Sequence, residues 1–305
     1  MRRTVLLAAV FVALSCFALP PWSRASVSLT PAGDGHVTVP AFVDGKGPYA
    51  FIVDTGADGS AVYQWFAQAA KLPRASSGGE TLTGMTGSFS SSAYRLRSLG
   101  VDGHAVSDVE VDVLPNRRDR GHEAGVIGND FMDGTITVFD FACRRIEIRS
   151  RSAASSIAAE DGPAVRAGRA GDTSLLQFPV TLNGVRGTAV LDTGDRASKI
   201  NTSYARLAGI DPAAGTFSDA APVFGADDKP IVPRFGPIGR VQFGGITLDG
   251  VRAQVANVAI VTQLFGEKPV LWLGADLLQH VRVVYDHHAD RVWFGRSACA
   301  GDDST

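Results

Sequence analysis

The sequence contains one long pattern twice, and this repeat restricts the possible folds more than any other feature. In each copy, two apolar segments separated by a glycine turn end in Asp-Thr-Gly, at residues 54–56 and again at residues 192–194. Farther along each copy, two apolar residues precede a glycine, at residues 126–128 and 272–274. The period is too long for a solenoid, so the repeat predicts two homologous halves.

Short alternating segments dominate both halves. Apolar and polar residues alternate over residues 109–113 and 145–148, and Gly244-Gly245 separates two further segments in the manner of a hairpin turn. Helical patterns are few and short, while the 34 glycines favour tight turns. We therefore expect an all-β fold made of two antiparallel, β-rich lobes.

The pattern along the chain suggests four segments. Residues 1–25 are a predicted signal peptide, and residues 26–149 form the predicted N-terminal lobe. Residues 150–172 are rich in Ala, Ser, Gly and Arg and have no strong period, so they are predicted to be a linker. Residues 173–305 form the predicted C-terminal lobe.

The N-terminal segment has the features of a secretory signal. Arg2 and Arg3 precede an apolar run over residues 5–19, and small residues stand before position 26 as at a cleavage site. This run is shorter than the roughly 20 residues that cross a bilayer comfortably, so no stable membrane span is expected after cleavage. We predict an exported protein, periplasmic or secreted. The alternatives are a membrane anchor through this segment and a lipoprotein at Cys16.

Two cysteines, Cys143 and Cys299, follow the predicted signal peptide. An exported protein meets an oxidising compartment, where a disulfide could tie the C-terminal tail to the first lobe. Two unpaired thiols are the other interpretation, and both stay open at this point. The cysteine spacing suggests no metal site. His287-His288 is interpreted as a solvated turn rather than as part of a metal cluster.

The Asp-Thr-Gly tripeptide alone can be a strand that ends in a turn. Its recurrence at the same place in both halves, each time with the apolar-apolar-Gly segment downstream, favours a chemical role instead. These residues resemble the aspartic peptidases of the retropepsin and pepsin type, in a bacterial-like, single-chain, two-lobed form. The residues that carry the resemblance are Asp54-Thr55-Gly56-Ala57-Asp58 in the first half and Asp192-Thr193-Gly194 in the second.

This resemblance implies two lobes related by a pseudo-twofold axis, with the substrate cleft between them. One chain supplies both halves, so a monomer is sufficient for an active site. The implied catalytic dyad is Asp54 and Asp192. Two carboxylates about 3 Å apart cannot both ionise, so they share one proton. One member can then take a proton from water while the other polarises a peptide carbonyl, and no metal or organic cofactor is needed.

The rest of each motif would support the dyad. Gly56 and Gly194 would let the backbone approach the carboxylates closely. The resemblance also implies that Thr55 and Thr193 hydrogen-bond across the lobe interface and hold the two loops in register.

Residues 81–89 fall where the family places its flap, a hairpin that closes over an extended substrate and excludes water. The tip of this hairpin contains Gly84, Met85, Thr86 and Gly87. The alternative interpretation is an ordinary surface hairpin.

The sequence departs from the family pattern near both motifs. Asp195 and Arg196 follow the second motif, where Ala or Ser and then Asp are usual. The extra carboxylate would raise the pKa of the dyad unless Arg196 or solvent compensates for its charge. Asn129 and Ala275 stand where retropepsins carry an arginine, so Asp58, at the edge of the substrate site, lacks that partner within its lobe.

The formal net charge of −2 gives no reason to expect a nucleic-acid partner. We expect an exported aspartic endopeptidase that acts on extended polypeptides. The alternative is a non-catalytic, bilobal peptide-binding protein that retains the same fold.

Overall fold

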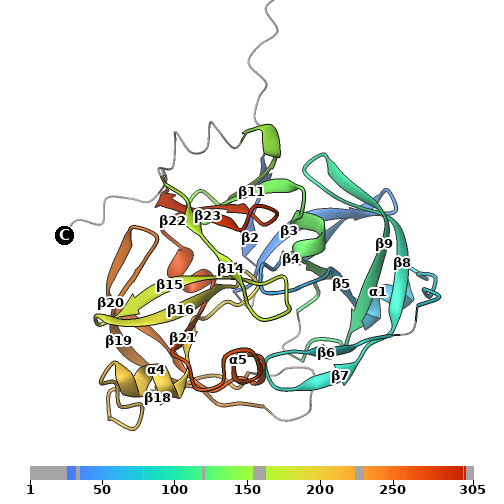
Figure 1. The fold of residues 1–305 in the computed structure, drawn as a ribbon. Helices are drawn as coiled ribbons and strands as arrows, with labels where there is room; N and C mark the ends of the chain where they lie inside the picture. Colours follow the sequence, from blue (N-terminus) through green and yellow to red (C-terminus); the bar gives the residue numbers. More distant parts are fainter. Residues whose placement is uncertain are drawn as a thin grey trace, which may run out of the picture.

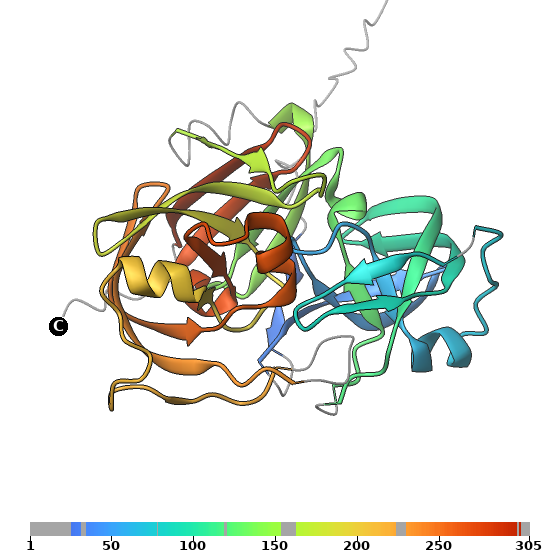
Figure 2. The same cartoon turned by 60° about the horizontal axis from the view of Figure 1, so that its bottom comes forward.

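The computed structural model describes residues 26–31, 35–77, 79–118, 121–153, 163–223, 230–297 and 299. The predicted signal peptide, residues 1–25, lies outside the described residues. Two β-rich lobes lie side by side, as Figures 1 and 2 show. None of the described helices is both long and apolar enough to cross a bilayer.

The first lobe is a seven-stranded sheet in the order β2-β3-β4-β10-β5-β9-β8, and an additional pairing of β3 with β8 closes it on itself. Closure of this kind removes exposed strand edges. The strands are β2 (Thr30–Pro31), β3 (Val37–Val43), β4 (Lys46–Val53), β5 (Ala61–Tyr63), β8 (Ala93–Val101), β9 (His104–Leu114) and β10 (Gly125–Ile127), with helices α1 (Gln64–Ala69) and α2 (Asn129–Met132).

The second lobe repeats this plan in eight strands, in the order β14-β15-β16-β21-β17-β20-β19-β18, with β15 also paired to β19. The elements are β14 (Gly168–Arg169), β15 (Leu176–Leu182), β16 (Val185–Leu191), β17 (Lys199–Ile200), α4 (Thr202–Leu207), β18 (Ser218–Asp219), β19 (Arg234–Phe243), β20 (Ile246–Val255), α5 (Ala259–Phe265), β21 (Val270–Leu273) and η2 (Ala275–Leu278).

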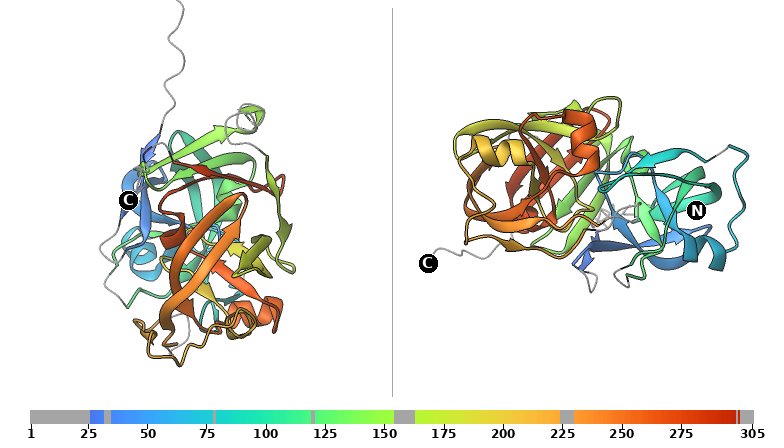
Figure 3. Two further views of the ribbon diagram at one scale, coloured as in Figure 1. Left: turned by 90° about the vertical axis from the view of Figure 1, so that its left-hand side faces the viewer. Right: turned by 90° about the horizontal axis from the view of Figure 1, so that it is seen from below.

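A six-stranded antiparallel sheet joins the lobes, in the order β1-β12-β11-β22-β23-β13. Its centre is the pairing of β11 with β22, in which one strand comes from each half. Figure 1 shows β11, β22 and β23 between the two lobes at the top of the view, and the right-hand view of Figure 3 shows the two lobes side by side. The strands are β1 (Val27–Ser28), β11 (Thr135–Asp140), β12 (Arg145–Ser150), β13 (Val165–Arg166), β22 (Val281–Asp286) and β23 (Arg291–Arg296). The expected all-β, two-lobed fold is confirmed.

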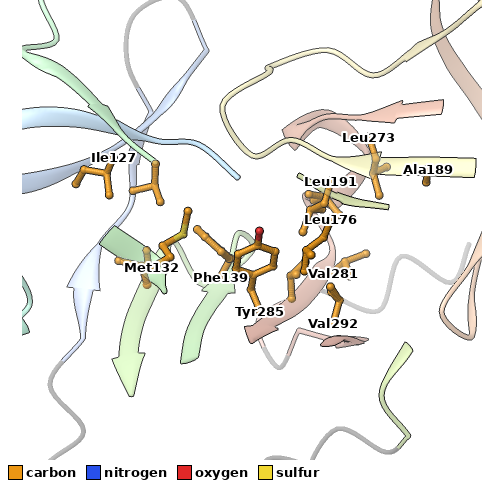
Figure 4. Packing of buried hydrophobic residues seen from close by; sticks show 14 of the residues in the cluster. Ile127, Met132, Phe139, Leu176, Ala189, Leu191, Leu273, Val281, Tyr285 and Val292 are labelled. Carbon is orange, nitrogen blue, oxygen red and sulfur yellow. The ribbon is translucent and has the colours of Figure 1, made fainter. Parts of the chain in front are cut away.

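One hydrophobic core runs through both lobes. Side chains that point alternately inward and outward along the strands form this core. In β15, Leu176, Phe178 and Val180 are buried, while the residues between them are more exposed. Figure 4 shows Phe139 and Tyr285, from the paired strands β11 and β22, lying between core residues of the two lobes. The lobes therefore share one apolar interior and do not merely touch.

The range predicted as a linker contains regular structure. The short helix η1 (Arg151–Ala153) follows β12, and residues 154–162 lie outside the described residues. The strands β13 and β14 fall in the same range and pair with β23 and β15. Strands of two residues are too short to show a period. The predicted domain boundaries themselves stay a prediction.

The structure decides between the two interpretations of the cysteines. Cys143, in the turn between β11 and β12, forms a disulfide with Cys299, beyond β23, and the two Cα atoms are 5.1 Å apart. The bond ties the C-terminal end to a turn of the first half across a sequence separation of 156 residues.

Removing this disulfide should destabilise the protein. A cross-link over so long a segment restricts the unfolded chain strongly, so we expect the double variant Cys143→Ser/Cys299→Ser to lose about 2–5 kcal/mol in free energy of unfolding. Urea denaturation of the variant and of the oxidised wild type measures this loss. Reduced wild type is the control and should resemble the variant; equal stability of all three would contradict the prediction.

Candidate active site

The two Asp-Thr-Gly loops follow directly after β4 and β16. Each of these strands pairs in parallel with the apolar strand that ends before the downstream glycine, β10 in the first lobe and β21 in the second. The pairing continues into the loops, because Asp54 N–H donates to Ile127 O and Asp192 N–H donates to Leu273 O, both at 2.9 Å. The two repeated segments thus occur together because they form neighbouring, parallel strands in each lobe.

Reciprocal hydrogen bonds between two threonines join the loops. Thr55 Oγ1 donates to Leu191 O at 2.8 Å, and Thr193 Oγ1 donates to Val53 O at 2.7 Å. Each hydroxyl also accepts from the backbone N–H of the other threonine, at 3.1 and 3.2 Å. Both threonines are buried. The two loops are therefore fixed to one another across the lobe boundary.

These loops bring the carboxyl groups of Asp54 and Asp192 into hydrogen-bonding contact. A Cβ added to Gly56 would lie 2.6 Å from Cγ of Asp192, and one added to Gly194 would lie 2.2 Å from Cγ of Asp54. Any other residue would push the opposite carboxyl away. Gly56 N–H also donates to Asp54 Oδ1 at 2.7 Å.

Burial raises the pKa of both carboxyl groups. For Asp54, burial is the largest cause. The pKa of Asp192 lies well above its usual range because of burial first, and then because of the nearby charges of Asp54 and Asp195. The close contact and the raised pKa values favour a pair that holds one shared proton.

A second symmetric layer supports the loops from behind. Ser60 donates to Asp130 through its hydroxyl at 2.7 Å, and its Oγ accepts from Gly128 N–H at 3.1 Å. The second lobe repeats these bonds with Ser198, Asp276 and Gly274, at 2.6 and 2.9 Å. The two serines were not among the predicted site residues. Their spacing could have revealed them, because Ser60 stands six residues after Asp54 and Ser198 stands six residues after Asp192.

A family model described as aspartyl protease matches residues 39–131 and 178–277, one match for each repeat. Together the matches cover more than half of the chain. The chain belongs to the aspartyl protease family. No curated protein matches it.

The extra carboxylate after the second motif, Asp195, has a charged partner. Lys199 Nζ donates to Asp195 Oδ2 and to Ala197 O, the latter at 2.7 Å. The Lys199 side chain is 3% exposed and that of Asp195 is 12% exposed. This lysine compensates for the Asp195 charge, a role for which the sequence suggested Arg196 or solvent. Ala61 stands at the corresponding position of the first lobe, so this ion pair occurs on one side only.

Asp58 finds its partner in the other half. Asp58 Oδ1 accepts from Ser174 N–H and from Ser174 Oγ, both at 2.6 Å. Asn129 Nδ2 donates to Ser174 Oγ and to Thr55 O, both at 3.1 Å, while Asn129 Oδ1 accepts from Tyr285 O–H at 2.8 Å. Where retropepsins carry an arginine, a neutral amide therefore links the first motif to the second half. A role of Asp58 in substrate binding stays a prediction.

The interpretation of His287-His288 as a solvated turn is wrong for His287. This residue is buried, with Nδ1 2.9 Å from Asp133 Oδ1 and Nε2 3.0 Å from Ser174 O. Only His288 is exposed. Among the described residues, no group of three acidic, histidine or cysteine side chains is arranged to hold a metal ion.

The predicted flap is a hairpin of β6 (Thr81–Thr83) and β7 (Ser88–Ser90), and Gly84 N–H donates to Gly87 O at 2.8 Å near its tip. The tip reaches the other lobe. Ala259 N–H, at the start of α5, donates to Met85 O at 2.8 Å, and Figure 1 shows β6 and β7 beside α5. The Met85 side chain packs against an apolar cluster that includes Trp272.

Two further features of the site were not predicted from the sequence. Trp272 donates its indole N–H to Asp192 Oδ2. Thr86 Oγ1 is buried at the flap tip and has no hydrogen-bonding partner within the described part of the chain. Thr86 was predicted to lie at the flap tip, but neither the burial of its hydroxyl nor the indole donor was, because each depends on a contact between distant segments.

Replacing Lys199 by methionine should destabilise the fold. The variant Lys199→Met leaves the Asp195 carboxylate poorly hydrated and without its cation, so we expect the free energy of unfolding to fall by about 3–5 kcal/mol. The double variant Asp195→Asn/Lys199→Met removes both charges and should recover most of that loss. Chemical denaturation of the two variants and of wild type measures it. A single variant as stable as wild type would contradict a role for the ion pair.

Shortening Met85 should loosen the docked flap. Met85→Ala removes part of its apolar contact with the second lobe, about 1 kcal/mol, while the backbone bond to Ala259 can still form. We expect the amide hydrogen of Ala259 to exchange about fivefold faster, because the flap opens more often. Thr81→Ala, at the exposed base of the hairpin, is the control. Equal exchange in both variants would show that Met85 does not hold the flap.

Proposed function

We propose that this protein is an exported aspartic endopeptidase that hydrolyses peptide bonds of extended polypeptides with water activated by Asp54 and Asp192. The observation that carries the proposal is the contact between these two carboxyl groups, held in place by the reciprocal Thr55 and Thr193 hydrogen bonds. Membership of the aspartyl protease family supports the same reaction class.

The chemistry follows from the shared proton. The ionised member of the dyad accepts a proton from a water molecule, whose oxygen attacks the peptide carbonyl carbon. The protonated member hydrogen-bonds the carbonyl oxygen and stabilises the charge that develops there. A proton then passes to the leaving amine nitrogen as the C–N bond breaks. The dyad ends the cycle with one proton, as it began.

The surroundings of the dyad favour a polypeptide substrate with apolar side chains. Apolar clusters flank the dyad on both sides: Ile52 and Val126 belong to one in the first lobe, and Val190 and Trp272 to one in the second. The flap can close over an extended chain, and the buried Thr86 hydroxyl offers it a hydrogen-bonding group. Because both aspartates belong to one chain, we propose that the monomer is active.

Export is supported by two independent features. The N-terminal segment has the pattern of a secretory signal. The Cys143–Cys299 disulfide is of a kind that persists in oxidising compartments such as the periplasm or the extracellular space. We propose a periplasmic or secreted location, with anchoring through the N-terminal segment as the alternative.

Each aspartate of the dyad should be needed for cleavage. We expect Asp54→Asn and Asp192→Asn to lower kcat/KM on an unfolded protein substrate by about 10²–10⁴-fold or more, because neither amide can carry the shared proton. Cleavage assays over the acid-to-neutral range, with and without a transition-state-like inhibitor, measure the effect. Asp108→Asn, at an exposed position, is the matched control.

Loss of folding would not explain such a result. The pKa of both carboxyl groups is raised by burial, so the folded state holds its protons to higher pH than the unfolded chain does. Ionisation therefore lowers stability as pH rises above the usual carboxyl pKa, and Asn removes this effect. Both variants should be at least as stable as wild type at neutral pH. Absence of cleavage by wild type would favour the non-catalytic, peptide-binding alternative.

A further inference from the structure

The dyad is less symmetric than the backbone that holds it. Trp272, in β21, stands two residues before Gly274, and Val126, in β10, stands two residues before Gly128. Both side chains lie beside the dyad in equivalent places, since Val126 pairs with Ile52 and Trp272 with Val190. Valine offers no hydrogen-bonding group, whereas the indole offers one N–H donor.

The hydrogen bonds to the two carboxyl groups differ accordingly. Asp192 accepts on both oxygens, from Asp195 N–H at Oδ1 (2.8 Å) and from Trp272 Nε1–H at Oδ2. Apart from its contact with Asp192, Asp54 accepts only from Gly56 N–H within the described part of the chain. The second lobe therefore gives its aspartate one side-chain donor that the first lobe does not.

The indole is well suited to hold a charged acceptor. Its N–H can only donate, so it stabilises an ionised carboxylate more than a protonated carboxyl. Trp272 is 2% exposed and packs among the apolar residues of the second-lobe cluster, so its ring is fixed in place. Water does not screen a hydrogen bond in such surroundings.

We infer that Trp272 is a positioning residue of the dyad, whose indole N–H fixes the Asp192 carboxyl group and favours its ionised form. This inference rests on the proposed peptidase function. Burial favours the protonated form of Asp192, and the indole hydrogen bond acts in the opposite direction. The singly protonated dyad consequently persists to lower pH than it would without the indole.

Other charged or titratable groups face the dyad from several elements. Asp195 lies on the second loop and its partner Lys199 on β17, and His36 acts on Asp54 from the segment before β3. The Tyr285 phenol approaches from β22. All of them are unchanged when Trp272 alone is substituted. A difference between such a variant and wild type therefore reports the indole.

The test is the pH profile of kcat/KM for Trp272→Phe, which keeps an aromatic ring and loses the N–H. We expect the acidic limb to move up by about one to two pH units, because a hydrogen bond to a charged group is lost. Trp293→Phe is a matched control, since the Trp293 indole is also buried but its N–H has no partner within the described residues. An unshifted acidic limb in Trp272→Phe would overturn the inference.

A second measurement does not depend on activity. The stabilisation by the indole is present while Asp192 is ionised and is lost as pH falls through its pKa. The difference in free energy of unfolding between wild type and Trp272→Phe should therefore shrink toward acid pH. It should not vary with pH when both proteins also carry Asp192→Asn. A pH-independent difference in the Asp192 background would overturn the inference.

The two proposals fail in different ways. If wild type cleaves no substrate but the stability difference depends on pH as expected, the peptidase function is wrong and the hydrogen bond is upheld. If wild type cleaves and Trp272→Phe has the same pH profile, the peptidase function stands and the inference about Trp272 is wrong.

Discussion

The reciprocal hydrogen bonds of Thr55 and Thr193 are the interaction on which the rest of the site depends. Each hydroxyl donates to a carbonyl of the opposite lobe and accepts an N–H from it, so four buried polar contacts are satisfied at once. One lobe alone would leave these groups buried and unpaired, or exposed to water. The geometry of the dyad is thus a property of the two lobes together, and the shared core and the six-stranded sheet keep the lobes in place.

The hydrogen bonds that hold the two loops are symmetric, but several side chains beside them differ between the lobes. Backbone bonds and the serine–aspartate layer repeat in both halves, while Trp272 and Lys199 on one side correspond to Val126 and Ala61 on the other. Because the backbone holds the carboxyl groups, the residues beside them can change without moving the dyad. One lobe can therefore carry charged or hydrogen-bonding side chains beside the dyad that the other lobe lacks.

The sequence predicted the lobes and loops that recur, but it missed several polar contacts around them, including the recurring bonds of Ser60 and Ser198. The repeat identified both lobes, and recurrence of Asp-Thr-Gly identified the two loops that meet. The Lys199 pairing with Asp195 was missed because the two residues lie on a loop and a short strand, where a spacing of four implies no contact. The Ser174 partner of Asp58 lies 116 residues away and belongs to the other half. A single sequence carries no signal for such a contact.

The site balances opposing effects on one shared proton. Burial favours the neutral forms of Asp54 and Asp192, and the Asp195 carboxylate adds to this tendency. Donors from Gly56, Asp195 and Trp272 favour the charged form, and Lys199 neutralises the third carboxylate. With burial alone the dyad would hold both protons and lack a base. With donors alone it would lose both and lack an acid, so the working state needs both kinds of contact.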